Sequence, residues 1–220
     1  MTITASLAIL RIFGMAGTGV IVLAIVYSAV RYHGKRGERF SLLNHFISEL
    51  GEVGVSPAAW VFNAGLILGG LMTLSFNIGL GLAFASLWGW FGMAAGIIAT
   101  LGVAAVGVFP MNNLTPHVRA ATTYFRAGLG MVFFFGLAIL FQPAERVIVQ
   151  RLANLLSLLA VLAYATFLSW PSWKKAPEEA KNPLDPEQVP ERPRVWALAL
   201  LEWSVFFSTV AWLFGMAFLI

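Results

Sequence analysis

Long apolar stretches alternate with short polar ones along the whole chain, and this alternation predicts the elements. Each stretch is close to or beyond the roughly 20 apolar residues with which an α-helix crosses about 30 Å of hydrocarbon. We therefore expect an all-α fold: a polytopic membrane protein built as a six-transmembrane-helix bundle. Most of the 220 residues lie in these spans, so we expect a single integral membrane domain over 1–220. The predicted spans are residues 8–30, 58–84, 88–109, 121–142, 152–170 and 195–219.

The connection between the first two spans contains an amphipathic stretch, residues 40–52. Its apolar side chains recur at helical spacing, at Phe40, Leu43, Phe46, Ile47 and Leu50. This pattern favours a short amphipathic helix lying at the membrane interface. A second interpretation is that His45 and Glu49, four residues apart on such a helix, line a binding site.

The second and third spans are separated by a very short turn, so we expect them to form an antiparallel hairpin. Two glycine pairs occur at a spacing of four residues, Gly65 with Gly69 and Gly92 with Gly96. Small residues at this spacing let helix backbones approach closely in a membrane. We expect these glycines to bring the two spans of the hairpin together.

Charged residues are rare, and their distribution orients the protein. Only 11% of the residues are charged, while 59% are hydrophobic. Lys and Arg are retained on the cytoplasmic side of a cell membrane, so the side with more of them is predicted to be cytoplasmic. Both termini belong to the opposite side and are therefore expected outside. The predicted cytoplasmic side carries Arg31, Lys35, Arg36, Arg39, Arg119, Arg126, Lys174, Lys175, Lys181, Arg192 and Arg194, against Arg11, Arg146 and Arg151 on the other. The net charge of +4 reflects these basic loops, so no nucleic-acid partner is expected.

The stretch 171–194 is predicted to be a cytoplasmic linker. It contains six of the ten prolines, with acidic and basic charges in balance. Such a composition cannot bury a core and favours an extended segment.

Two ionisable residues, Arg126 and Glu202, lie within the predicted hydrocarbon. A charge at the centre of a span costs roughly 2.5–3.5 kcal/mol, so each is expected to have a partner. Both lie about five to seven residues from the cytoplasmic end of their spans, a depth of roughly 8–10 Å. Equal depth and opposite sign predict an ion pair between the fourth and sixth spans.

Polar residues from three regions gather at the predicted cytoplasmic end, where they would form a polar pocket between the helices. We take these residues as candidate ligand-binding residues. They are Asn44, His45, Ser48, Glu49, Asn112, His117, Arg119, Arg126 and Glu202.

Two short blocks of sequence resemble the signatures of a membrane protein family, the "domain of unknown function 998". The first block is Asn44-His45-Phe46-Ile47-Ser48-Glu49-Leu50-Gly51, followed by Pro57 and by Phe62-Asn63-Ala64-Gly65. The second is Gly107-Val108-Phe109-Pro110, followed by His117. The resemblance implies a six-span fold over nearly the whole chain, and it implies no particular activity.

The inventory of residues excludes several membrane functions. Haem held between spans needs intramembrane histidine, and we expect His33, His45 and His117 in loops or the interfacial segment. Retinal needs an intramembrane lysine, and every lysine lies outside the spans, so neither cofactor is expected. Without cysteine, thiolate catalysis and disulfides are also excluded.

Three functions remain after these exclusions. We favour a non-enzymatic protein whose polar pocket binds a lipid, another amphiphile or a membrane partner, with Arg126, His117 and Arg119 facing an anionic head group. A small-molecule transporter is the first alternative. The second is a metal-dependent lipid hydrolase with His45, Glu49 and His117 as metal ligands. Membrane lipids are the expected partners, with a membrane-protein partner or a second copy of the chain as further candidates.

Overall fold

A computed structural model of the protein describes residues 3–170 and 193–220. Within these residues six helices are long and apolar enough to cross a membrane, which confirms a multi-pass, all-α membrane protein. They are α1 (Ile3–Arg31), α2 (Ala59–Phe84), α3 (Leu87–Val108), α4 (Leu114–Leu140), α5 (Asn154–Ser169) taken together with the short helix before it, and α6 (Ala197–Leu219). Two short 3-10 helices, η1 (Ile47–Gly51) and η2 (Arg151–Ala153), precede α2 and α5. The predicted linker, apart from its last two residues, lies outside the described residues.

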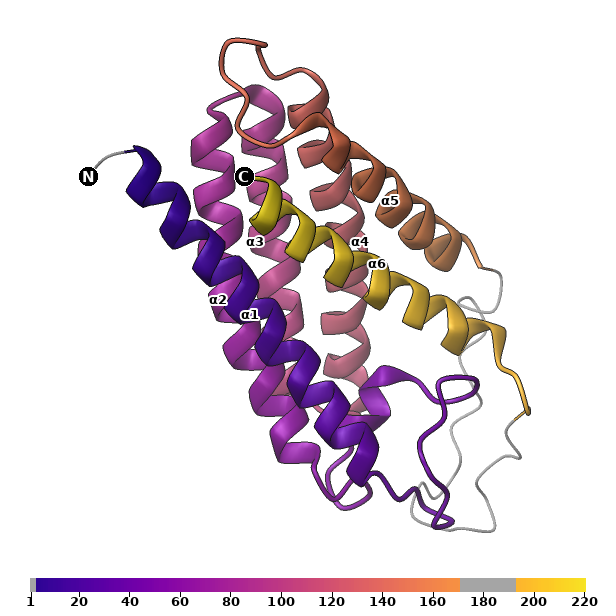
Figure 1. Cartoon of the computed structure of the whole chain (residues 1–220). Helices are drawn as coiled ribbons and strands as arrows, with labels where there is room; N and C mark the ends of the chain where they lie inside the picture. Colours follow the sequence, from indigo (N-terminus) through magenta and orange to yellow (C-terminus); the bar gives the residue numbers. More distant parts are fainter. Residues whose placement is uncertain (1–2, 171–192) are drawn as a thin grey trace.

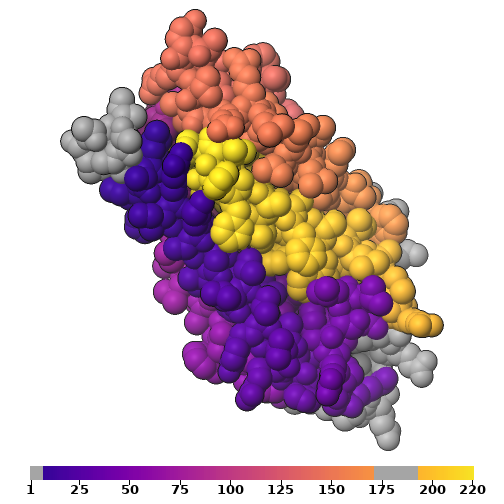
Figure 2. Space-filling view, in the orientation of Figure 1, coloured from indigo at the N-terminus to yellow at the C-terminus, as the bar shows by residue number. Residues whose placement is uncertain are grey.

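Helices α1 and α6 cross the front of α2, α3 and α4 in Figure 1. The space-filling view shows α6 between α1 and α5 on this face (Figure 2). Both ends of the chain lie at the same end of the bundle, where the Arg11 side chain donates to the backbone carbonyl of Ile220. Six spans are an even number, so the chain returns to the side of the membrane on which it began, as the predicted spans require.

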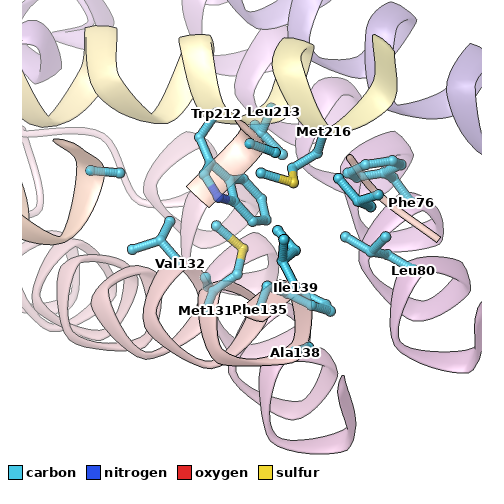
Figure 3. Close-up of a cluster of buried hydrophobic side chains, with 14 of the residues drawn as sticks. Phe76, Leu80, Met131, Val132, Phe135, Ala138, Ile139, Trp212, Leu213 and Met216 are labelled. Atoms are coloured by element: carbon cyan, nitrogen blue, oxygen red, sulfur yellow. The ribbon is translucent and has the colours of Figure 1, made fainter. Parts of the chain in front are cut away.

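The centre of the bundle is a cluster of buried side chains from α2, α4, α5 and α6. Figure 3 shows Trp212 and Met216 of α6 packed over Phe135 and Ile139 of α4, with Phe76 of α2 beside them. Lipid tails are as apolar as these side chains, so the free energy of helix association comes from close packing and interhelical hydrogen bonds. One such bond joins α6 to α5, where the Trp212 Nε1–H donates to Ser157 Oγ at 3.0 Å.

The α2–α3 hairpin forms as predicted, although its glycines do not all face the hairpin partner. Ala85 ends α2 in the left-handed conformation, and the Ser86 side chain caps α3 by accepting from Gly89 N–H at 3.1 Å. Gly96 does pack against α2, at Asn77. Gly65 and Gly69 instead lie against α1, and Gly92 lies against Phe135 of α4. These other glycine contacts therefore join each hairpin helix to its outer neighbour.

Helix α4 begins at Leu114, seven residues before the predicted start of the fourth span. Pro116 lies in the first turn, where a helix has no use for the backbone N–H that proline lacks. The proline that predicted a loop therefore sits inside the helix, and His117 belongs to α4 rather than to a loop.

The amphipathic helix expected over residues 40–52 is present only as the five-residue helix η1. Residues 40–46 are turns and irregular backbone, and Glu49 and Leu50 are buried. Two apolar residues of this stretch pack on the bundle: Phe40 lies against Trp203 and Phe46 against Trp196 of the α6 entry, whereas Leu43 is exposed. Aromatic contacts with α6 and its entry therefore account for part of the apolar pattern.

Candidate functional site

The segment between α1 and α2, residues 32–58, folds back over one end of the bundle, and we call it the cap. Three groups at the start of α6 hold its backbone at alternate residues. Trp196 N–H donates to Leu43 O at 2.8 Å, and Trp203 Nε1–H donates to His45 O at 3.1 Å. Between them in α6, a carboxylate oxygen of Glu202 accepts from Ile47 N–H at 2.9 Å. Glu202 therefore anchors the cap.

The cap is also joined to the connection between α3 and α4. Asn112 pairs with the backbone of Val53 twice, accepting from its N–H at 2.7 Å and donating to its carbonyl at 2.9 Å. Ser48 Oγ–H donates to the sulfur of Met111 at 3.3 Å. Asn44 Nδ2–H reaches Pro193 O at 3.2 Å. The polar atoms of these candidate residues thus bind parts of the chain itself.

The three proposed metal ligands are not arranged as a ligand set. Among the described residues, no group of three His, Asp or Glu side chains is placed to hold a metal ion. Glu49 Oε1 accepts from Phe46 N–H at 2.8 Å, at the start of η1. His117 Nδ1 lies 2.8 Å from Phe109 O, so this nitrogen carries the hydrogen and binds a carbonyl. The hydrolase hypothesis therefore lacks the geometry it requires.

His45 is buried beside aromatic rings rather than facing an open pocket. The residue is 2% exposed, and its ring lies against Tyr32 and Phe40. Nδ1 lies 3.2 Å from the backbone N–H of Ser41, and Nε2 lies 3.9 Å from a carboxylate oxygen of Glu38. The His45 side chain thus packs inside the cap, among cap residues.

The predicted ion pair between Arg126 and Glu202 is wrong. The described residues contain no salt bridge between them, and Glu202 instead binds the cap backbone. Arg126 is exposed on the outer face of α4. The two helices carry residues of equal depth, but depth along a helix does not determine the face on which a side chain lies.

Arg126 lines a groove on the outer face of α4, together with a second arginine. This arginine groove has a volume of about 270 Å³ and is lined by Val118, Arg119, Thr122, Thr123 and Arg126. These positions recur every three or four residues, which places them on one stripe of the helix. The two threonines were not among the predicted site residues, although the spacing from Arg119 to Arg126 would have revealed them.

An apolar groove adjoins the arginine groove and shares Arg119 and Thr123 with it. It lies between α3 and α4 and has a volume of about 430 Å³. Its remaining lining is Ile98, Leu101, Gly102, Ala105, Phe109, Pro116 and Ala120. A charged surface and an apolar surface thus meet at Arg119.

The arginines at the opposite end of the molecule are satisfied internally. Arg146 donates to Ala83 O at 3.2 Å, Arg151 donates to Gln142 O at 3.2 Å, and Arg11 donates to Ile220 O. Arg119 and Arg126 make no hydrogen bond or ion pair with any residue that the structure describes. Within the described residues, these two guanidinium groups thus differ from the three at the opposite end.

A family model described as "Protein of unknown function (DUF998)" matches residues 15–219, which is nearly the whole chain. No curated protein and no solved structure matches the chain.

Proposed function

This chain belongs to the DUF998 family of proteins of unknown function, and we propose that it is a non-enzymatic membrane protein that binds an anionic amphiphile on α4. The anionic group lies in the arginine groove between Arg119 and Arg126. The apolar part lies in the neighbouring groove between α3 and α4.

The observation that carries this proposal is the pair of arginines without a protein partner among the described residues. Arg126 lies about 18 Å along α4 from Leu114, at about 1.5 Å per residue. A charge inside the hydrocarbon costs roughly 2.5–3.5 kcal/mol unless it is compensated. Glu202, an ionisable residue of another spanning helix, has such a partner in the backbone N–H of Ile47. An anion supplied by the membrane would do the same for Arg126.

The shape of the adjoining groove supports an amphiphile rather than a small soluble anion. Its α3 wall is formed by Ile98, Leu101 and Ala105, which offer hydrocarbon contact next to the charged stripe. Arginine suits this role because its planar guanidinium forms paired hydrogen bonds with phosphate or carboxylate oxygens.

We further propose that the protein lies in the cell membrane with both termini outside. The cap and the α3–α4 connection then face the cytoplasm, together with Arg31, Lys35 and Arg39. In this orientation the arginine groove opens to the cytoplasmic leaflet, whose lipids include the anionic ones that basic surfaces attract.

Retention of an anionic lipid tests the proposal. The protein is reconstituted into phosphatidylcholine nanodiscs containing phosphatidylglycerol, and bound lipid is measured by native mass spectrometry. The double variant Arg119→Gln/Arg126→Gln should retain about tenfold less phosphatidylglycerol, because it loses two charge-assisted contacts.

A matched control removes the same charge at the same end of the molecule. Arg31 and Arg39 are exposed and lie outside both grooves, so Arg31→Gln/Arg39→Gln should retain phosphatidylglycerol as the unaltered protein does. Equal losses in the two double variants would show nonspecific attraction and would end the proposal.

A further inference from the structure

We propose that the ligand of the arginine groove is a lipid ending in a phosphate monoester. This inference rests on the proposed function and names the chemical class of its ligand. The charge of the lining, its hydrogen-bonding groups and the adjoining apolar surface all point to this class.

The net charge of the lining matches a dianion. Arg119 and Arg126 contribute two positive charges, and no Asp or Glu of the described residues lines either groove. A phosphate monoester carries about −1.5 to −2 at pH 7, because its second pKa is about 6. A phosphodiester or a carboxylate carries only about −1 and would leave one guanidinium uncompensated in the hydrocarbon.

The other ionisable groups near this face do not change the balance. Helix α3 contains no ionisable side chain. On α4, His117 faces Phe109 O, and Tyr124 accepts from the hydroxyl of Tyr164 of α5 at 3.1 Å. Glu202 lies at the cap, where it binds Ile47 N–H. No acidic side chain of the described residues therefore balances the two arginine charges.

The hydrogen-bonding groups of the stripe also suit a terminal phosphate. Each guanidinium offers five N–H donors, and a monoester presents three strongly accepting oxygens. Thr123 Oγ has no hydrogen bond within the described part of the chain and is exposed between the two arginines. Thr122 differs, since its hydroxyl already donates to Val118 O at 2.6 Å. Thr123 thus adds a third donor to the same stripe.

The apolar groove assigns the phosphate to a lipid rather than to free phosphate. Arg119 and Thr123 line both grooves, so a bound phosphate lies directly beside the surface of Ile98 and Leu101. A hydrocarbon chain attached to the phosphate would cover that surface, and inorganic phosphate would not.

Competition between two lipids with identical tails tests the assignment. The protein is placed in phosphatidylcholine nanodiscs with equal amounts of dioleoyl phosphatidic acid, a monoester, and dioleoyl phosphatidylglycerol, a diester. Native mass spectrometry then gives the ratio of the two bound lipids. At pH 7.5 we expect about a tenfold preference for phosphatidic acid, the value of one additional charge-assisted contact.

The same measurement at pH 5 reports the charge of the ligand. Below the second phosphate pKa of about 6 the monoester takes up a proton and carries about −1, like the diester. The preference should therefore disappear at pH 5, while both arginines keep their charge. Arg126→Gln should remove the preference at pH 7.5, and Arg39→Gln should preserve it.

Each contrary result has a distinct meaning. Equal binding of the two anionic lipids at pH 7.5 would overturn the monoester assignment and leave the proposed function standing. Binding of neither above phosphatidylcholine would overturn both. Displacement of phosphatidic acid by an equal concentration of inorganic phosphate would overturn the assignment to a lipid. A preference that survives in Arg119→Gln/Arg126→Gln would place the site elsewhere and would overturn the assignment to this groove.

Discussion

The sequence singles out Glu202 and Arg126 as unusual residues but does not identify what they bind. Both were correctly selected from the sequence as exceptional, because a charge within an apolar span needs compensation. Their partners could not be predicted. Glu202 binds the backbone N–H of Ile47, and every residue except proline carries such a group, so the sequence does not single it out. Arg126 lies on a face with no protein partner among the described residues.

The hydrogen bond from the cap to Glu202 predicts an unequal response to two substitutions. Glu202→Gln keeps a carbonyl oxygen that accepts from Ile47 N–H, so the cap should remain docked. Glu202→Leu leaves that N–H without its acceptor, at a cost of about 1–3 kcal/mol. Thermal unfolding in detergent, together with trypsin cleavage after the cap residue Arg39, measures the loss.

Arg126→Gln is the control for this prediction. It should leave the cap cleavage rate unchanged, because Arg126 forms no ion pair with Glu202. If Arg126→Gln releases the cap as Glu202→Leu does, the ion-pair hypothesis would be restored and the hydrogen bond to Ile47 would not explain the docking of the cap.

The length of each apolar stretch predicted the six spans well. It predicted less well where α4 begins and how the segment between α1 and α2 folds. Most predicted ends lie within a few residues of the helices, since hydrocarbon thickness imposes the length. Helix α4 differs because Pro116 is compatible with a first turn. The cap differs because its apolar residues pack on Trp196 and Trp203, which are distant in sequence. A periodic pattern identifies the apolar residues but not the surface that covers them.

The contact between α1 and α2 predicts a strong effect at one glycine. A Cβ atom at Gly69 would meet Ile21 and would lie 2.7 Å from the backbone oxygen of Gly17. Because backbone atoms cannot rotate away, Gly69→Ala should push the two helices apart and destabilise the protein by about 1–3 kcal/mol. The fall in unfolding temperature in detergent measures this cost.

Gly19 of helix α1 provides the matched control. A Cβ atom there meets no other atom within 4 Å, so Gly19→Ala should be neutral or stabilising by about 0.5–1 kcal/mol through its better helix propensity. Similar losses for Gly19→Ala and Gly69→Ala would show that the α1–α2 contact is not as close as described.

For the whole molecule, the arrangement of the helices leaves two different ends. At one end Arg11, Arg146 and Arg151 are bound to backbone carbonyls. At the other the cap is bound to α6 and to Asn112, and the two grooves open on α4 nearby. Several candidate polar residues lie at this end, where Asn44, Ser48 and Glu202 bind other parts of the chain. Arg119 and Arg126 lie instead on an exposed face of α4, and the spacing of residues in the sequence does not give these side-chain directions.

Orientation in the membrane determines which leaflet can supply the ligand, and single cysteines can measure it. The chain has no cysteine, so each substitution introduces one thiol. Glu145 and His33 are exposed. The connection after α4, which contains Glu145, and the cap, which contains His33, lie at opposite ends of the bundle in Figure 1. With both termini outside, a membrane-impermeant maleimide should label Glu145→Cys in intact cells and His33→Cys only after permeabilisation. The reverse pattern would place the arginine groove in the outer half of the membrane, and the amphiphile would then have to come from the outer leaflet.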